Sequence, residues 1–188
     1  MQGATSIVDG SAMSSRIYFP RAVLPLMAVC ANAYALIASV VVLLVLTVSL
    51  GTPIDAHILL LLPAMLLLVL FTLSLALVLS ALHVFFRDIR YIVQATLLAL
   101  FYVTPIFYSL TPVTRGGRLS VIQPHGVVRD LILVNPLSGV VEFFRASIGA
   151  ADHVWPVAVA ITAGWTLVLL TLGLVLQARW DRLFVDLL

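Results

Sequence analysis

Long apolar stretches without a charged residue dominate this chain. Four stretches of 24 to 33 uncharged residues lie between Arg21 and Asp55, Asp55 and Arg87, Arg90 and Arg115, and Asp152 and Arg179. Roughly 20 helical residues cross a hydrocarbon core of about 30 Å, so each stretch is long enough to span a membrane once. The sequence therefore predicts four transmembrane helices, near residues 24–48, 60–83, 91–110 and 155–177.

The composition supports an all-α integral membrane protein with one domain, residues 1–188. The chain is 63% hydrophobic and 10% charged, whereas soluble domains carry about 25% charged residues. A net charge of +2 without an arginine cluster gives no indication of a nucleic-acid partner. Cys30 is the single cysteine and the four histidines are widely separated, so we expect no intrachain disulfide and no metal site.

A short amphipathic helix is predicted before the last span. Asn135 can cap it, Pro136 suits its first turn, and Gly149 can end it. Its apolar side chains fall on one face and its polar side chains on the other: Leu137, Val140, Val141, Phe144 and Ile148 against Ser138, Glu142 and Arg145. This pattern is typical of a helix that lies in the membrane interface or dips in and returns. A short surface helix packed on the bundle is the alternative.

The arginine distribution predicts that both termini are cytoplasmic. That orientation places six arginines in cytoplasmic segments: Arg16, Arg21, Arg87, Arg90, Arg179 and Arg182. The external connection around Gly51–His57 then contains none, and the second external loop, 111–153, is too long for its charges to weigh heavily. The sequence has no GxxxxGK[ST] phosphate loop, so ATP, if it drives this protein, must bind another chain.

Five motifs follow one another along these stretches. They are Phe19-Pro20-Arg21 with Leu24-Pro25, Arg87-Asp88, Thr104-Pro105-Ile106-Phe107-Tyr108, Asn135-Pro136, and Arg145. In order and spacing they resemble the permease subunits of ABC-2 type exporters, nearest the branch that exports O-antigen, teichoic acid and capsular polysaccharide. The resemblance extends from about residue 5 to the C-terminus.

The resemblance implies a transport subunit of the bacterial plasma membrane, not an enzyme. It would form a homodimer, assemble with an ATP-binding cassette ATPase subunit, and move a lipid-linked polysaccharide among the membrane lipids. ATP and Mg would bind the partner subunit, and we expect no cofactor on this chain. The family usually has six spans, and the first two are missing here. We expect a fragment, a start site placed too late, or a shortened form.

Near the N-terminus, the resemblance implies that the segment Ser6–Tyr18 docks on the ATPase. The docking residues would be Arg16, Phe19, Pro20 and Arg21. The alternative is a basic membrane anchor whose prolines begin a helix. Arg87 and Asp88 match the family's cytoplasmic turn, where we expect a structural role.

The third predicted span is the most polar one, and in the family the corresponding helix lines the translocation path. The path residues would be Phe101, Tyr102, Pro105 and Tyr108. We expect Pro105 to lie within the helix and to bend it, and aromatic faces suit the stacking of sugar rings. An interfacial aromatic belt is the alternative explanation for Phe107 and Tyr108.

Beyond this span, the resemblance places Asn135, Pro136, Glu142 and Arg145 in short re-entrant helices on the external side. Three other functions stay open. One is an ABC-2 permease for a drug or small lipid, and another is a non-transporting membrane scaffold. The third is a membrane-bound enzyme, for which His125, Arg129 and Asp130 are the single candidate cluster, without a nucleophile beside a base.

Overall fold

The regular structure of this chain is helical throughout the part that can be described. The computed structural model describes residues 2–9, 23–51, 56–86, 88–106, 127–149 and 155–187, and these contain no strand. The α-helices are α1 (Gln2–Asp9), α3 (Val23–Ser49), α4 (Leu61–Phe85), α5 (Ile89–Val103), α6 (Val127–Val134), α7 (Pro136–Ser147) and α8 (Trp155–Leu187), and a 3-10 turn, η1 (Ala56–Leu60), leads into α4. The predicted all-α class is confirmed.

Three of these helices are long and apolar enough to cross a membrane. They comprise Val23–Ser49, Ala56–Phe85 and Trp155–Trp180, with 27, 30 and 26 residues. The fourth predicted span corresponds to α5, which is apolar but has 15 residues. At 1.5 Å per residue α5 is about 22 Å long, less than a hydrocarbon core of about 30 Å. The described residues therefore support three spans, and the fourth is not confirmed.

The predicted position of Pro105 within a bent helix is wrong. The helix ends at Val103, and Thr104 takes an extended conformation with φ −70° and ψ 135°. A proline ring clashes with a helical residue before it and provides no N–H for the next helical bond. Pro105 thus ends α5 instead of kinking it.

The helices α4 and α8 form the centre of the bundle. Gly173 lets the two backbones approach closely, because a Cβ atom there would lie 2.8 Å from Leu77 Cβ. Gln177 of α8 is buried, and its Nε2 donates to the Leu77 carbonyl (3.2 Å) and to Ser80 Oγ (3.1 Å) of α4. Near one end of the pair, the Phe85 and Trp180 rings meet edge to face with centroids 4.7 Å apart.

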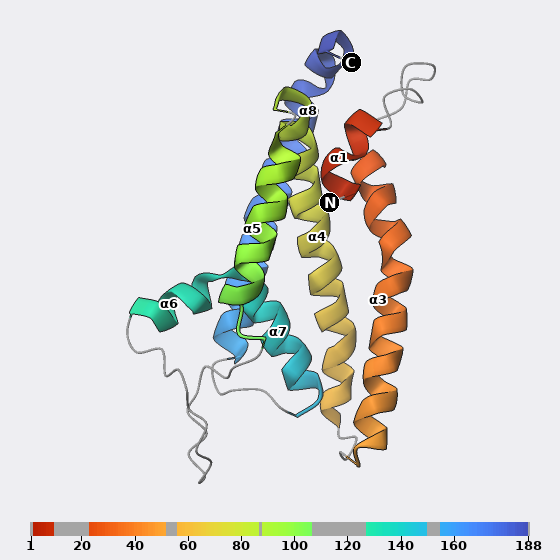
Figure 1. Cartoon of the computed structure of the whole chain (residues 1–188), viewed down its shortest axis with the longest axis vertical. Coiled ribbons are helices and arrows are strands. Elements are labelled where there is room, and N and C mark those ends of the chain that lie inside the picture. Colours follow the sequence, from red (N-terminus) through yellow and green to blue (C-terminus); the bar gives the residue numbers. More distant parts are fainter. Residues whose placement is uncertain are drawn as a thin grey trace.

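On one side of this centre lie α3 and the short helix α1, which packs against both α3 and α4 (Figure 1). The polar side chains within α3 donate to carbonyls of their own helix: Asn32 to Ala28, Ser39 to Ala35, Thr47 to Leu43 and Ser49 to Val45. Such bonds satisfy polar groups that would otherwise be costly in lipid. The backbone then turns at Gly51, whose φ of +72° favours glycine.

Along the long axis, the two ends of the bundle differ. In Figure 1, α1, the C-terminal end of α8 and the α4–α5 junction lie toward one end, and the C-terminal end of α3 and the N-terminal end of α4 lie at the other. The helix α5 occupies the half near the first end, and α7 occupies the other half. Together, α5 and α7 extend along about the same length of the bundle that α3, α4 and α8 each span as a single helix.

Candidate functional site

The most unusual feature of the bundle is the break between its short helices. α5 ends at Val103, and the α6–α7 junction at Asn135 meets that end in the middle part of the bundle (Figure 1). At membrane depth, non-helical backbone is tolerated only where protein buries it or water lines it. Thr104, Pro105 and Asn135 are all buried. The protein therefore buries the non-helical backbone of this break, as a break at membrane depth requires.

Asn135 joins the two sides of the break. Its Oδ1 accepts the Leu137 N–H (3.1 Å) and so caps α7, while its Nδ2 donates to Thr104 Oγ1 (3.0 Å). The Thr104 hydroxyl in turn donates to the Leu100 carbonyl of α5 (2.6 Å). One side chain thereby caps one helix and contacts the end of another, 31 residues earlier in the sequence.

The carbonyls around the α6–α7 junction are satisfied by side chains. The Ile132 carbonyl accepts from Ser138 Oγ (2.6 Å), the Val134 carbonyl from Trp165 Nε1 (3.1 Å), and the Pro136 carbonyl from Thr162 Oγ1 (2.7 Å). Two of the three donors, Thr162 and Trp165, lie one turn apart on α8. The spanning helix α8 thus provides the polar groups that a helix break within lipid requires.

The polar face of α7 is turned toward the protein. Ser138 and Glu142 are fully buried, at 0% exposure, whereas Leu137, Val141 and Phe144 are only partly covered. α7 packs against α8 and α4. The predicted cap, first-turn proline and final glycine (φ +71° at Gly149) are confirmed. α7 is therefore packed on the bundle through its polar face, and its position in the membrane interface or in a re-entrant turn stays a prediction.

Glu142 and Arg145 form an ion pair on this buried face. Arg145 Nη1 lies 2.7 Å from Glu142 Oε1, and Arg145 Nη2 donates to the Ile106 carbonyl (2.9 Å). The guanidinium therefore connects α7 to the residues that follow α5. The structure brings together the predicted residues Pro105, Asn135, Pro136, Glu142 and Arg145 at one site.

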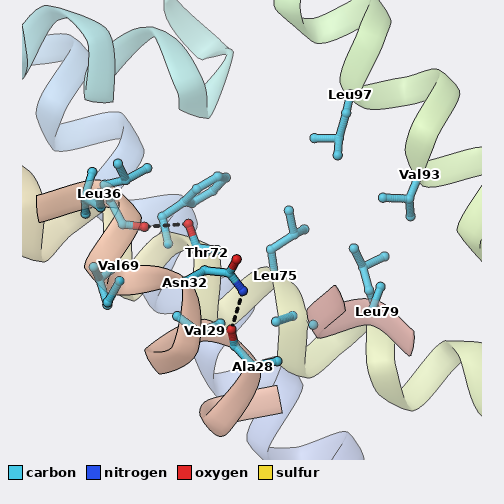
Figure 2. Close-up of a pocket in the computed structure, with 16 residues that line it drawn as sticks. Ala28, Val29, Asn32, Leu36, Val69, Thr72, Leu75, Leu79, Val93 and Leu97 are labelled. Atoms are coloured by element: carbon cyan, nitrogen blue, oxygen red, sulfur yellow. Dashed lines mark hydrogen bonds between the residues drawn. The ribbon is translucent and has the colours of Figure 1, made fainter. Parts of the chain in front are cut away.

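A groove of about 580 Å³ runs between α1, α3, α4 and α5. Figure 2 shows Val93 and Leu97 of α5 across the cavity from Leu75 and Leu79 of α4. The polar groups within it, Asn32 and Thr72, donate to carbonyls of their own helices (2.7 and 2.8 Å). The lining is otherwise mostly apolar, so the groove suits hydrocarbon better than a sugar.

The remaining predicted site residues lie elsewhere. Phe101 and Tyr102 are exposed on α5, with ring centroids 5.6 Å apart. Asp88 is exposed at the N-terminal end of α5, and its side chain makes no capping bond. The other predicted residues lie outside the described part of the chain: Arg16, Phe19, Pro20, Arg21, Arg87 and Tyr108.

Sequence reasoning missed the partners that α8 provides. Thr162 and Trp165 of α8 were not among the predicted site residues, yet they donate to the Pro136 and Val134 carbonyls of the junction. Gly139 of α7, also not predicted, lets the two helices approach each other. A threonine and a tryptophan at i, i+3 within an apolar span were the available signal. That signal is weak, because threonine often bonds its own helix, as Thr171 does.

Comparison with known proteins identifies one informative relative. Over 144 residues the chain is 30% identical to the O-antigen export system permease protein RfbA of Myxococcus xanthus. The match covers 77% of this chain and 52% of the relative, so the chain spans about half the length of that protein. No family model matches the chain. The resemblance to polysaccharide export permeases, drawn from the five motifs, is confirmed by this relative.

Proposed function

Because this chain is a relative of an O-antigen export permease, we propose that it is the transmembrane subunit of an ATP-binding cassette exporter. The substrate would be a lipid-linked polysaccharide, which the complex moves across the bacterial plasma membrane. The permease would act as a homodimer with both termini in the cytoplasm. ATP and Mg would bind a separate ATPase subunit, and this chain would carry no cofactor.

One observation supports transport most strongly: the buried helix break between α5 and α7. In transporters, short and interrupted membrane helices commonly mark the region where the substrate passes. Here the non-helical residues Thr104, Pro105 and Asn135 are buried. Asn135 donates to Thr104, and the carbonyls of the junction accept hydrogen bonds from Ser138, Thr162 and Trp165. A membrane scaffold has no need of such a junction, because uninterrupted helices satisfy their own backbone.

The proposed mechanism contains no covalent step on this chain. ATP binding would close the two ATPase subunits, and the segment around Arg16, Phe19, Pro20 and Arg21 would transmit that movement to α3. The permease halves would then change between inward-closed and outward-open arrangements. α5, with exposed Phe101 and Tyr102, would line the path on which sugar rings slide.

The assembly is tested by purifying the C-terminally tagged gene product from its own membranes. We expect a stoichiometric ATP-binding cassette ATPase in the eluate. Purification without any ATPase would contradict the exporter and favour the scaffold. If the ATPase is present but a deletion strain has normal surface polysaccharide, the result would favour a different cargo.

The docking role is tested by changing Pro20 and Arg21 together to alanine. We expect this variant to lose the coupling of ATP hydrolysis to export while the permease stays in the membrane.

The path is tested by Tyr102→Ala. The side chain is 71% exposed on α5, so its removal costs little packing, and we expect export to fall at least several-fold at unchanged abundance. Tyr34→Ala is the matched control, because Tyr34 is 73% exposed on α3. The rate of appearance of surface polysaccharide, divided by permease abundance, measures the effect. Equal rates for the two variants would remove Tyr102 from the path.

A further inference from the structure

The position of α5 cannot be fixed by packing along its length. Among residues 89–103, all of which the structure describes, only Val93 is buried. The groove of Figure 2 separates part of α5 from α4, with Val93 and Leu97 forming its wall. A helix that buries so little apolar surface gains little free energy from its position. Its location must depend on how its two ends are held.

The near end is held by the chain itself. A short turn joins Phe85 to Ile89, and the Phe86 carbonyl accepts the Ile89 N–H (3.1 Å). This turn fixes where α5 begins but leaves its direction to other contacts. The far end, at Thr104–Ile106, then decides how α5 lies relative to the bundle.

The far end is held by α7. Polar contacts cross the break from Asn135 Nδ2 to Thr104 Oγ1 (3.0 Å) and from Arg145 Nη2 to the Ile106 carbonyl (2.9 Å). They lie on either side of Pro105, which is buried. Both donors belong to one short helix and its cap. Movement of α7, or loss of these two bonds, would therefore release the end of α5.

Glu142 orients the Arg145 guanidinium that contacts the end of α5. Its carboxylate is fully buried, and a buried charge is retained only where a partner satisfies it. Arg145 provides that partner through Nη1 (2.7 Å), and the planar guanidinium then directs Nη2 at the Ile106 carbonyl. A guanidinium can serve two acceptors with one fixed fork, which an ammonium cannot do in the same geometry.

We propose that Glu142 and Arg145 form a latch that positions the far end of α5, and that its release lets α5 swing away from α7. Arg145 is a positioning residue, and Glu142 aims it. The swing would widen the groove beside α4 and change the path along α5. The link to export depends on the function proposed above, but the swing itself does not.

The test measures the position of α5 without transport. Spin labels are attached at Leu98→Cys on α5 and Leu66→Cys on α4, both exposed positions, in a Cys30→Ser background in lipid nanodiscs. We expect one narrow distance distribution in the chain with an intact latch. Arg145→Gln should broaden it and add a longer distance. Arg90→Gln, at the near end of α5 beside Tyr91, is the matched control and should leave it narrow.

A double variant separates the latch from simple folding. Arg145→Gln alone removes the ion pair of the buried Glu142 carboxylate and can prevent folding. Glu142→Gln with Arg145→Gln removes both charges, so we expect a stably folded protein in which the broad distribution persists. A narrow distribution in the double variant would overturn the latch. A broad distribution with unchanged export would keep the latch and contradict its role in the proposed function.

Discussion

α7 and α8 approach each other closely at Gly139. A Cβ atom at this position would lie 2.1 Å from Thr162 Oγ1 and 2.2 Å from the Ala158 carbonyl oxygen. One of these neighbours is backbone, so a side-chain rotation alone cannot make room. Thr162 also donates to the Pro136 carbonyl, and a shift of α8 would break that bond. Small residues commonly allow such contacts between membrane helices.

We therefore expect Gly139→Ala to destabilise the protein by at least about 1–3 kcal/mol, the usual cost of overpacking. Gly164→Ala on α8 is the control, because a Cβ atom there has no neighbour within 4 Å. Thermal unfolding in detergent, followed by tryptophan fluorescence, compares the two variants with the parent. A Gly139→Ala melting temperature equal to that of Gly164→Ala would show that α7 and α8 are less tightly joined than described.

Among single residues, the sequence predicted the features of α7 that depend on residues nearby in the chain. The Asn135 cap, Pro136 in the first turn, and the glycine after α7 follow from local backbone chemistry. The direction of the polar face of α7 could not be predicted in the same way. It depends on Thr104 and Thr162, each more than 25 residues away in the sequence.

Among the elements, α4 and α8 form the most extensive contact, and a polar group secures it. Gln177 is buried and donates to both the Leu77 carbonyl and Ser80 Oγ. The Leu77 carbonyl already belongs to a helical ladder, so Gln177 shares an occupied acceptor. Gly173 lies one turn earlier and keeps the backbones close enough for the bonds to form.

Gln177→Ala should lower the free energy of unfolding by roughly 1 kcal/mol, in line with interhelical hydrogen bonds in membranes. Thr171→Val on the same helix should have less effect, because the Thr171 hydroxyl donates to the Leu167 and Val168 carbonyls of its own helix. Urea or detergent unfolding measures both. If the two variants lose the same stability, the α4–α8 contact depends on packing, and Gln177 adds nothing specific.

The helix boundaries show which elements a sequence can place. The stretches between charges predicted α3, α4 and α8, because an uncharged apolar run of such length has few other structures available. They overestimated α5, since the same run continues past Val103 while Thr104 and Pro105 end the helix. An apolar stretch indicates which residues can lie in lipid. The residue at which a helix ends depends instead on local backbone geometry, such as that before a proline.

For the molecule as a whole, the central question is which end of the bundle faces the cytoplasm. α1 and the C-terminal end of α8 lie toward the same end, together with the α4–α5 turn (Figure 1). In the sequence, six arginines belong to the segments that flank these elements, whereas the connection around Gly51–His57 has none and residues 111–153 contain four. From the positive-inside rule we predict that α1, the C-terminal end of α8 and Asp88 lie in the cytoplasm and that Leu50 lies outside, because long loops such as 111–153 count little in that rule.

Two single cysteines test this orientation in a Cys30→Ser background. Leu50 and Asp88 are exposed near opposite ends of the bundle, so Leu50→Cys and Asp88→Cys should both react once the membrane is opened. In intact spheroplasts, a membrane-impermeant maleimide should label only Leu50→Cys. Labelling of Asp88→Cys alone would show that the protein has the opposite orientation in the membrane. The residues proposed to dock on the ATPase, Arg16–Arg21, would then lie outside the cell, where no ATPase could bind them, and this result would contradict the proposed exporter mechanism.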